Sequence, residues 1–346
     1  MRIIHAADFH LDSPFDGLTP EQAVARRGEQ RQVLQRLAEL ARSSQAELIL
    51  LPGDLLDSER VYQETVETLS RTLGQLGVPV FIAPGNHDYY TARSPYAVNQ
   101  WPDNVHIFRS GRIEAVELPE LNAVVYGAAF TADGRSESLL SGFSVPEDGR
   151  LHIMALHADV DARQGSRYCP VSTDDIAASG LDYLALGHIH ACSGVCMAGS
   201  VPWAYSGCPE GRGFDELGVK GVLCGKIEHG KADLRFVPLC QRQYQILELP
   251  VTTEDDVGSI ANKALSLQLA EGGGQFTDFH RPQSSLCSKA ARPKRVACWI
   301  FAVSSSLVAA SSFSRMQRRN RPVRFSSLIR SQRSWLTRVR SRKETL

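Results

Sequence analysis

Polar side chains that can bind metals follow directly after five apolar runs of this sequence, and this pattern restricts the fold more than any other feature. In an open sheet of parallel strands, ligands bind at the edge where the strands end. Strands that end together would gather these side chains, so the pattern predicts an α/β fold with one composite site. The five clusters are Asp8-Phe9-His10, Gly53-Asp54-Leu55-Leu56-Asp57, Gly85-Asn86-His87-Asp88, His157 and Gly187-His188-Ile189-His190.

The first hundred residues alternate between two hydrophobic periods. Short apolar runs at 1–7, 47–51 and 78–83 are typical of buried strands. Between them, residues 21–43 and 61–76 repeat apolar side chains at the spacing of a helix. This β-α-β-α-β order predicts a parallel sheet covered by helices.

From about Val105 onward, short strands separated by glycine-rich turns dominate the pattern. They favour a second sheet that packs on the first, with helices outside. The predicted fold class is therefore α/β, a two-sheet α/β/β/α sandwich. The expected strands are 105–108, 121–126, 151–156, 181–186, 201–205, 218–226 and 232–237.

Local spacing also favours convergence of the five clusters. Residues i and i+2 of an extended segment point the same way, so Asp8 and His10 can address one metal. His188 and His190 share this spacing, and each can reach a different ion of an adjacent pair. Glycines allow tight turns and close backbone approach at the same places, at positions 53, 85 and 187.

The residue types indicate a centre of two divalent metal ions. Mixed carboxylate, imidazole and amide-oxygen ligands suit Mn²⁺, Fe or Zn²⁺, with Mg²⁺ as a further option, better than a soft metal. Two such ions about 3.5–4 Å apart clamp a phosphoryl group and generate a nucleophile at neutral pH. Asp54 is central among the clusters and is expected to bridge the ions. The expected ligands are Asp8, His10, Asp54, Asn86, His157, His188 and His190.

Other candidate ligands are assigned structural or solvated roles. A single histidine after a strand is more often a core or surface residue than a ligand, so only the ordered set argues for metal. Histidines 5 and 152 lie within expected strands, and histidines 106, 229 and 280 lack a matching context. The eight cysteines form no C-x-x-C pair, which predicts free thiols in a reducing cytosol. No secretory leader or membrane span is recognisable, so we expect a cytoplasmic protein.

The ordered motifs D-x-H, G-D-x-x-D, G-N-H-D, H and G-H-x-H resemble the calcineurin-like metallophosphoesterase superfamily from Met1 to about Leu239. The segments HAADFHLDSPFDGL, LILLPGDLLD, VFIAPGNHDYY and LDYLALGHIH are similar to SbcD-type DNA repair exonucleases, and among these to the YhaO-like bacterial branch. This resemblance implies a nuclease that depends on Mn²⁺. It also implies an SMC-like coiled-coil ATPase partner of the SbcC or YhaN kind, and a homodimer is compatible with it.

The resemblance also implies different roles for individual residues of the site. His87 would lie beside the scissile phosphate and protonate or stabilise the leaving oxygen, and Asp88 would orient it by accepting its ring N–H. Asp57 is expected to lie behind the ligands instead of binding metal. One ion would take Asp8, His10, Asp54 and His190, and the other would take Asp54, Asn86, His157 and His188.

The charge distribution predicts a boundary near residue 270. Residues 271–346 hold 16 Lys and Arg against 3 Asp and Glu, whereas residues 1–270 hold 22 against 35. We therefore expect a catalytic domain at 1–240, the start of a small capping domain at 241–270 with a helix at 254–269, and a basic Ser/Arg-rich tail at 271–346.

Three interpretations of the tail stay open. It is a disordered segment that binds nucleic acid through phosphate contacts, a folded cap without a recognisable pattern, or the product of a shifted reading frame. The last predicts that shifting the frame of the coding DNA near Glu271 restores an acidic, periodic sequence.

Three functions also stay open at this level. The first is a DNA exonuclease that hydrolyses phosphodiester bonds at DNA ends. The second keeps the metal chemistry but acts on a nucleotide, a phosphoprotein or another small phosphoester. The third is a binding subunit for DNA repair without catalysis.

Overall fold

A computed structural model describes residues 1–58, 60–162 and 165–248, and beyond them only 254–256, 258–259, 262–263, 266, 275–276 and 298–304. The chain divides into two compact units, Met1–Ser305 and Ser306–Leu346, and the second lies wholly outside the described residues. Half of the helix expected at 254–269 and most of the basic tail also lie outside the described residues.

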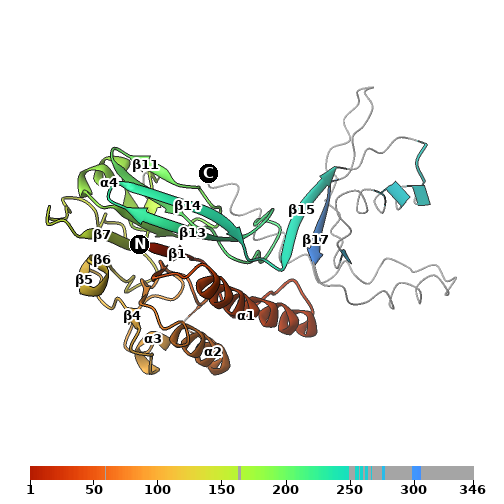
Figure 1. The fold of residues 1–346 in the computed structure, drawn as a ribbon. Coiled ribbons are helices and arrows are strands. Elements are labelled where there is room, and N and C mark those ends of the chain that lie inside the picture. Colours follow the sequence, from red (N-terminus) through yellow and green to blue (C-terminus); the bar gives the residue numbers. More distant parts are fainter. Residues whose placement is uncertain are drawn as a thin grey trace. The chain divides into compact units, whose positions relative to one another are not determined.

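The first sheet has six strands, and its middle is parallel (Figure 1). Strands β1 to β4 run parallel to one another, whereas β13 pairs antiparallel with β1 and with β14. The order across the sheet is β14 (Lys231–Pro238), β13 (Gly221–Glu228), β1 (Arg2–His5), β2 (Leu48–Leu51), β3 (Val80–Ile82) and β4 (Val105–Ile107).

The second sheet also has six strands, with antiparallel strands at its two edges. Strands β12, β10, β7 and β6 are parallel, and β11 and β5 close the edges. The order is β11 (Cys196–Ala198), β12 (Val201–Tyr205), β10 (Tyr183–Gly187), β7 (Leu151–His157), β6 (Ala123–Gly127) and β5 (Glu114–Leu118).

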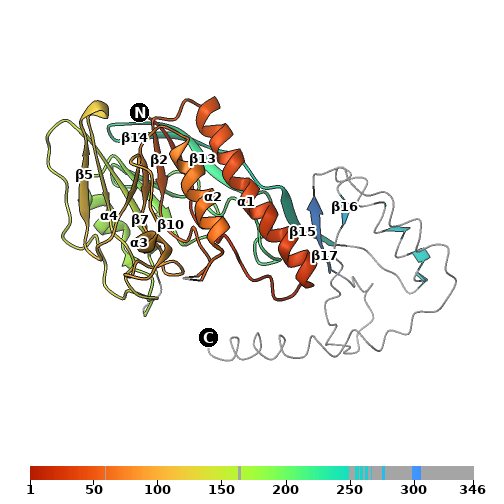
Figure 2. The same ribbon diagram turned by 90° about the horizontal axis from the view of Figure 1, so that it is seen from below.

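Strand β2 shows why its sequence is apolar throughout. Leu48 and Leu50 point into the core between the two sheets, whereas Ile49 and Leu51 point into the core beneath the helices. Both faces are buried, so the alternation of a half-exposed strand is absent. Helices α1 (Pro20–Ser43) and α2 (Gln63–Gly74) cover the outer face of the first sheet, as Figure 2 shows from below.

The second sheet has its own outer core, which includes residues of helix α4 (Thr173–Ser179). The layers are therefore helix, sheet, sheet and helix, and the predicted sandwich is confirmed. The other elements are short: α3 (Pro95–Val98), a 3₁₀ turn (Pro119–Leu121), and the paired strands β8 (Asp159–Val160) and β9 (Pro170–Val171).

The assignment of strands to sheets was wrong in one respect. The strands expected at 105–108, 218–226 and 232–237 belong to the first sheet as β4, β13 and β14. β13 returns along the free edge of β1, with Ile4 opposite Cys224. A hydrophobic period identifies a strand but not the strand beside it. The pairing of β13 with β1 could therefore not be predicted from the sequence.

After β14 in the chain, β15 (Arg242–Glu248) pairs with β17 (Cys298–Ser304), and β17 pairs with β16 (Gln275–Phe276). No helix in the described part of the chain is long and apolar enough to cross a membrane. The six cysteines whose side chains are described form no disulfide with one another.

Candidate metal centre

The five clusters lie at or just after the carboxyl ends of the parallel strands β1, β2, β3, β7 and β10. Four of the expected ligands have positive φ angles: 55° at Asp8, 44° at His10, 50° at Asp54 and 107° at His188. Such conformations are costly for residues other than glycine and gather at functional sites. Asp8 and His10 therefore converge through a tight turn, and the extended segment expected for them was wrong.

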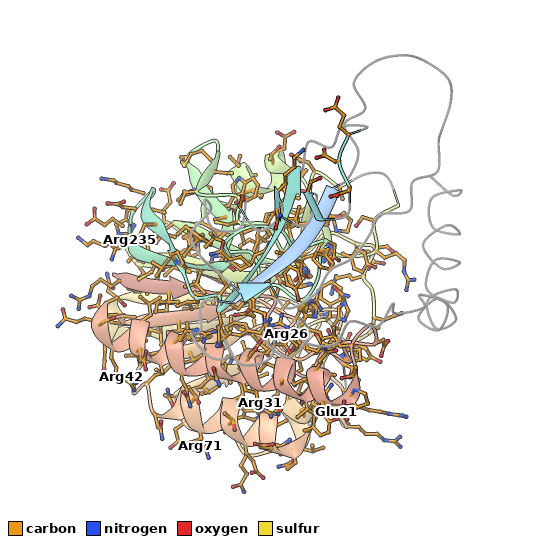
Figure 3. All side chains as sticks on the ribbon, turned by 90° about the vertical axis from the view of Figure 1, so that its right-hand side faces the viewer. Glu21, Arg26, Arg31, Arg42, Arg71 and Arg235 are labelled. Carbon is orange, nitrogen blue, oxygen red and sulfur yellow. The ribbon has the colours of Figure 1, made fainter. Side chains whose placement is uncertain are left out.

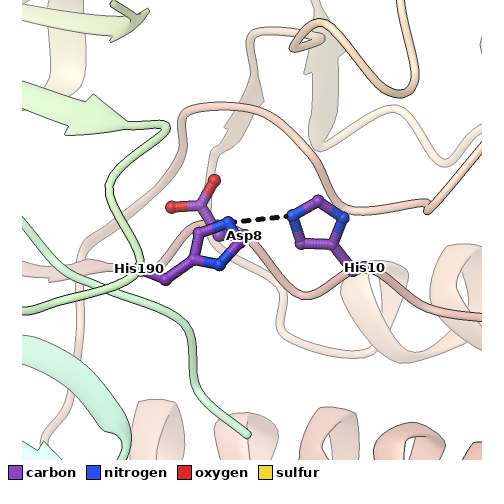
Figure 4. A group of neighbouring side chains, drawn as sticks. All are labelled: Asp8, His10 and His190. Carbon is purple, nitrogen blue, oxygen red and sulfur yellow. Dashed lines mark hydrogen bonds between the residues drawn. The ribbon is translucent and has the colours of Figure 1, made fainter. Parts of the chain in front are cut away.

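The first group of donor atoms comes from two loops that are far apart in the sequence. Nε2 of His10 lies 3.2 Å from Nε2 of His190, which comes from a loop 180 residues later in the chain. Asp8 contributes a carboxylate oxygen, and the three donor atoms lie within 4.8 Å of one another (Figure 4). We call these three residues with Asp54 the first half-site.

The second group forms around His157, the last residue of β7. Its Nε2 lies 3.0 Å from Oδ1 of Asn86 and 3.4 Å from Oδ2 of Asp54. The ring of His188 lies beside it, with centroids 5.3 Å apart. Together these four residues form the second half-site.

Asp54 lies between the half-sites. Its Oδ2 is 3.6 Å from Nε2 of His10 and 3.4 Å from Nε2 of His157, so one oxygen faces both groups. Its Oδ1 accepts a hydrogen bond from the backbone N–H of His87. This is the arrangement that a bridging carboxylate requires.

Burial creates an electrostatic problem that cations would relieve. Desolvation and the neighbouring Asp54 raise the pKa of Asp8 well above its ordinary value. Desolvation also lowers the pKa of His10 to about 4 and that of His188 to about 3, so both imidazoles are neutral donors at physiological pH. Clustered neutral imidazoles and buried carboxylates fit divalent metal ions.

The imidazoles are held from behind by oxygen atoms. Nδ1 of His10 lies 3.0 Å from Oδ1 of Asp57, and Nδ1 of His157 lies 3.1 Å from the carbonyl oxygen of Pro52. Nδ1 of His190 lies 2.7 Å from Oε1 of Glu216. A proton on each Nδ1 leaves Nε2 as the donor atom that faces the centre. The position of Asp57 behind His10 agrees with its expected supporting role.

His87 and Asp88 do not form the expected pair. Both oxygens of the buried Asp88 carboxylate accept hydrogen bonds, from the backbone N–H groups of residues 54, 55, 56 and 85 and from the Tyr96 hydroxyl. Asp88 therefore shapes the loops, and the prediction that it orients His87 was wrong. Nδ1 of His87 instead lies 3.2 Å from the Asp57 carbonyl oxygen, and its side chain is exposed at the edge of the site.

The sequence analysis did not predict two charged residues of the centre, Arg212 and Glu216. They lie in the loop between β12 and β13, which has no strand-end motif. Glu216 is buried and contacts His190, and Arg212 contacts Asp57. The only signal was their charge in a glycine-rich loop, and many surface loops share that composition.

Comparison with known proteins agrees with this architecture. The family model described as calcineurin-like phosphoesterase matches residues 1–192. The chain is 30% identical over 297 residues to the uncharacterized metallophosphoesterase YhaO of Bacillus subtilis (strain 168), covering 83% of this chain and 70% of that protein. It is 28% identical over 131 residues to a component of the nuclease SbcCD of Staphylococcus epidermidis, covering 36% of this chain and 33% of that component. The chain belongs to the calcineurin-like metallophosphoesterase family.

Proposed function

We propose that this protein is a phosphodiester hydrolase that holds two divalent metal ions and acts on DNA ends. The observation that carries the proposal is the position of Asp54, whose Oδ2 faces donor atoms of both half-sites at 3.6 and 3.4 Å. Two groups of ligands that share one carboxylate are the architecture of a two-metal phosphoryl-transfer site.

The chain's own residues prepare this chemistry. When bound, the two cations would neutralise the phosphoryl oxygens and make a water molecule acidic enough to attack at neutral pH. Asp8, His10 and His190 would hold one cation with Asp54, and Asn86, His157 and His188 would hold the other. When its ring is protonated on both nitrogens, His87 would donate Nδ1–H to the Asp57 carbonyl oxygen and would transfer the Nε2 proton to the leaving oxygen.

DNA is proposed as the substrate because of the relatives. The partial match to a nuclease component and the longer similarity to YhaO both favour the SbcD-type branch. The same reasoning proposes Mn²⁺ as the preferred metal, an SMC-like coiled-coil ATPase as partner and the cytoplasm as the location.

A second candidate is hydrolysis of a small phosphoester. Residues 1–270, which include the whole candidate centre, hold more acidic than basic side chains, 35 against 22. Such a body repels the DNA backbone more than it attracts it.

One comparison of substrates separates the candidates. Purified full-length protein is incubated with Mn²⁺ and linear duplex DNA, single-stranded DNA or bis-p-nitrophenyl phosphate, with His87→Ala as the control. We expect cleavage of DNA from its ends and of the small diester. Cleavage of the diester alone would overturn the DNA assignment, and no cleavage by a metal-loaded protein would indicate a binding subunit.

A further inference from the structure

Arg212 connects two carboxylates at the back of the first half-site. Its Nη1 lies 3.0 Å from Oδ1 of Asp57, and its Nη2 and Nε lie 2.8 and 3.1 Å from Oε1 of Glu216. Its backbone N–H donates to the other oxygen of Glu216 at 2.6 Å. One guanidinium group thus fixes the distance between two acidic side chains that come from separate loops.

These carboxylates are the ones that accept from His10 and His190. Asp57 lies 3.0 Å from Nδ1 of His10, and Glu216 lies 2.7 Å from Nδ1 of His190. We propose that Arg212 is a positioning residue that sets the relative orientation of these two imidazoles, and thereby the affinity of the first half-site for its metal ion. The proposal rests on the metal centre proposed above and is independent of whether the substrate is DNA.

The backbone of Arg212 is itself held from the side of α1 and β15. The hydroxyl of Tyr244 donates to the Arg212 carbonyl oxygen at 3.1 Å and accepts from Nη2 of Arg26 at 3.2 Å. Arg26 also donates to the carbonyl oxygen of Gly211. Figure 3 shows Arg26 between α1 and the strands, whereas Arg42 lies at the periphery. The loop that presents Arg212 is therefore fixed on both sides.

The geometry distinguishes this role from a substrate contact. Three guanidinium nitrogens of Arg212 are engaged by the carboxylates, and its side chain is only 22% exposed. A lysine at this position would keep the charge but could not reproduce two hydrogen bonds to Glu216 and one to Asp57 from a single rigid plane. The structure thus predicts that the shape of the guanidinium matters, and not only its charge.

The test is a calorimetric titration of Mn²⁺ into metal-free, full-length protein. For Arg212→Lys we expect the dissociation constant of one of two Mn²⁺ ions to rise about 10- to 100-fold while that of the other stays unchanged, as for other residues behind metal ligands. Glu216→Gln should weaken the binding of the same ion. This second variant keeps the proposal testable if Arg212→Lys folds poorly. Arg36→Lys is the matched control because Arg36 binds Glu210 and the Leu239 carbonyl, outside the centre.

Steady-state hydrolysis of bis-p-nitrophenyl phosphate supplies a second measurement. Excess Mn²⁺ should restore the kcat of Arg212→Lys with no change in KM, because the defect lies in metal binding. Unchanged affinity for both ions together with a raised KM would overturn the proposal and assign Arg212 to the substrate. Wild-type protein that binds no Mn²⁺ would instead contradict the proposed function itself.

Discussion

At the residue scale, Asp54 connects the half-sites through a single oxygen. Its Oδ2 lies within 3.6 Å of imidazole nitrogens from both groups. We expect Asp54→Ala to abolish binding of both Mn²⁺ ions, because each half-site loses its only shared anionic ligand. Metal analysis after gel filtration measures this, with the exposed Asp133→Ala as the control. Full occupancy in the Asp54 variant would contradict the bridging assignment.

We propose that His87 contributes to turnover without holding the metal. Its exposed ring lies at the edge of the first half-site, with its centroid 4.7 Å from that of His10. We expect His87→Ala to keep both Mn²⁺ ions and to lower kcat by about 10²- to 10⁴-fold, the range for loss of a positioned general acid. Parallel metal analysis and kinetics test this, and loss of metal in the variant would make His87 a ligand.

His5 makes stability depend on pH independently of the centre. It is fully buried, with Nδ1 2.9 Å from the Tyr183 hydroxyl and Nε2 3.0 Å from the Leu186 carbonyl oxygen. Burial lowers its pKa from 6.5 to about 3. Between these values the unfolded chain binds one more proton than the folded protein, so stability falls as the pH drops below 6.5, by up to about 1.4 kcal/mol per pH unit.

Urea unfolding of metal-free protein at pH 7 and pH 5 tests this expectation. His5→Asn should lose less stability between the two pH values than the wild type does, because the buried titrating group is gone. His229→Asn, at an exposed histidine, should lose as much as the wild type. Equal losses in all three proteins would show that His5 does not cause the acid sensitivity.

At the scale of elements, the strand-end loops of the two sheets approach each other through glycines. A side-chain carbon at Gly187, the last residue of β10, would overlap the carbonyl oxygen of Pro52, which follows β2. That carbonyl also accepts from Nδ1 of His157. The carbonyl group of Pro52 therefore has two effects. It leaves room only for glycine at position 187, and it orients the ring of His157, a proposed metal ligand.

We expect Gly187→Ala to lower the free energy of unfolding by about 1–3 kcal/mol, the usual cost of overpacking, and to weaken Mn²⁺ binding at the second half-site. Gly28→Ala in α1 is the matched control, because nothing lies within 4 Å of the added carbon. It should stabilise the helix by about 0.5–1 kcal/mol. Chemical denaturation and metal titration measure both effects, and unchanged metal binding in Gly187→Ala would contradict the link.

At the scale of the whole molecule, the centre joins both sheets. Asp8, Asp54 and Asn86 follow strands of the first sheet. In the second sheet, His157 is the last residue of β7, and His188 directly follows β10. A metal ion bound only by the folded protein stabilises it by mass action. We expect Mn²⁺ at about 100 times its Kd to raise the free energy of unfolding by about 2.7 kcal/mol for each of the two ions.

Thermal unfolding with Mn²⁺ or with a chelator measures this stabilisation. Asp54→Ala should show no Mn²⁺-dependent rise in Tm, which separates specific binding from a general effect of salt. A rise of the same size in that variant would mean that Mn²⁺ acts elsewhere on the protein.

The sequence was sufficient to predict the sandwich, because both signals are local. Apolar runs buried on two faces, as in β2, indicate strands, and a helical period such as that of α1 indicates its covering layer. It was also sufficient to nominate the ligand candidates, because each lies at or close to the end of a strand. The roles of these residues as ligands stay predictions until metal is measured.

Only the tertiary structure decided which side chains support the ligands and how the sheets are completed. Arg212 and Glu216 reach the centre because β13 returns to the edge of β1, a pairing across more than 200 residues that leaves no local pattern. Asp88 has the sequence context of a partner for His87, yet its carboxylate satisfies buried backbone N–H groups. Strand ends are encoded by neighbouring residues, whereas hydrogen-bond partners behind a site depend on contacts that form only when distant segments fold together.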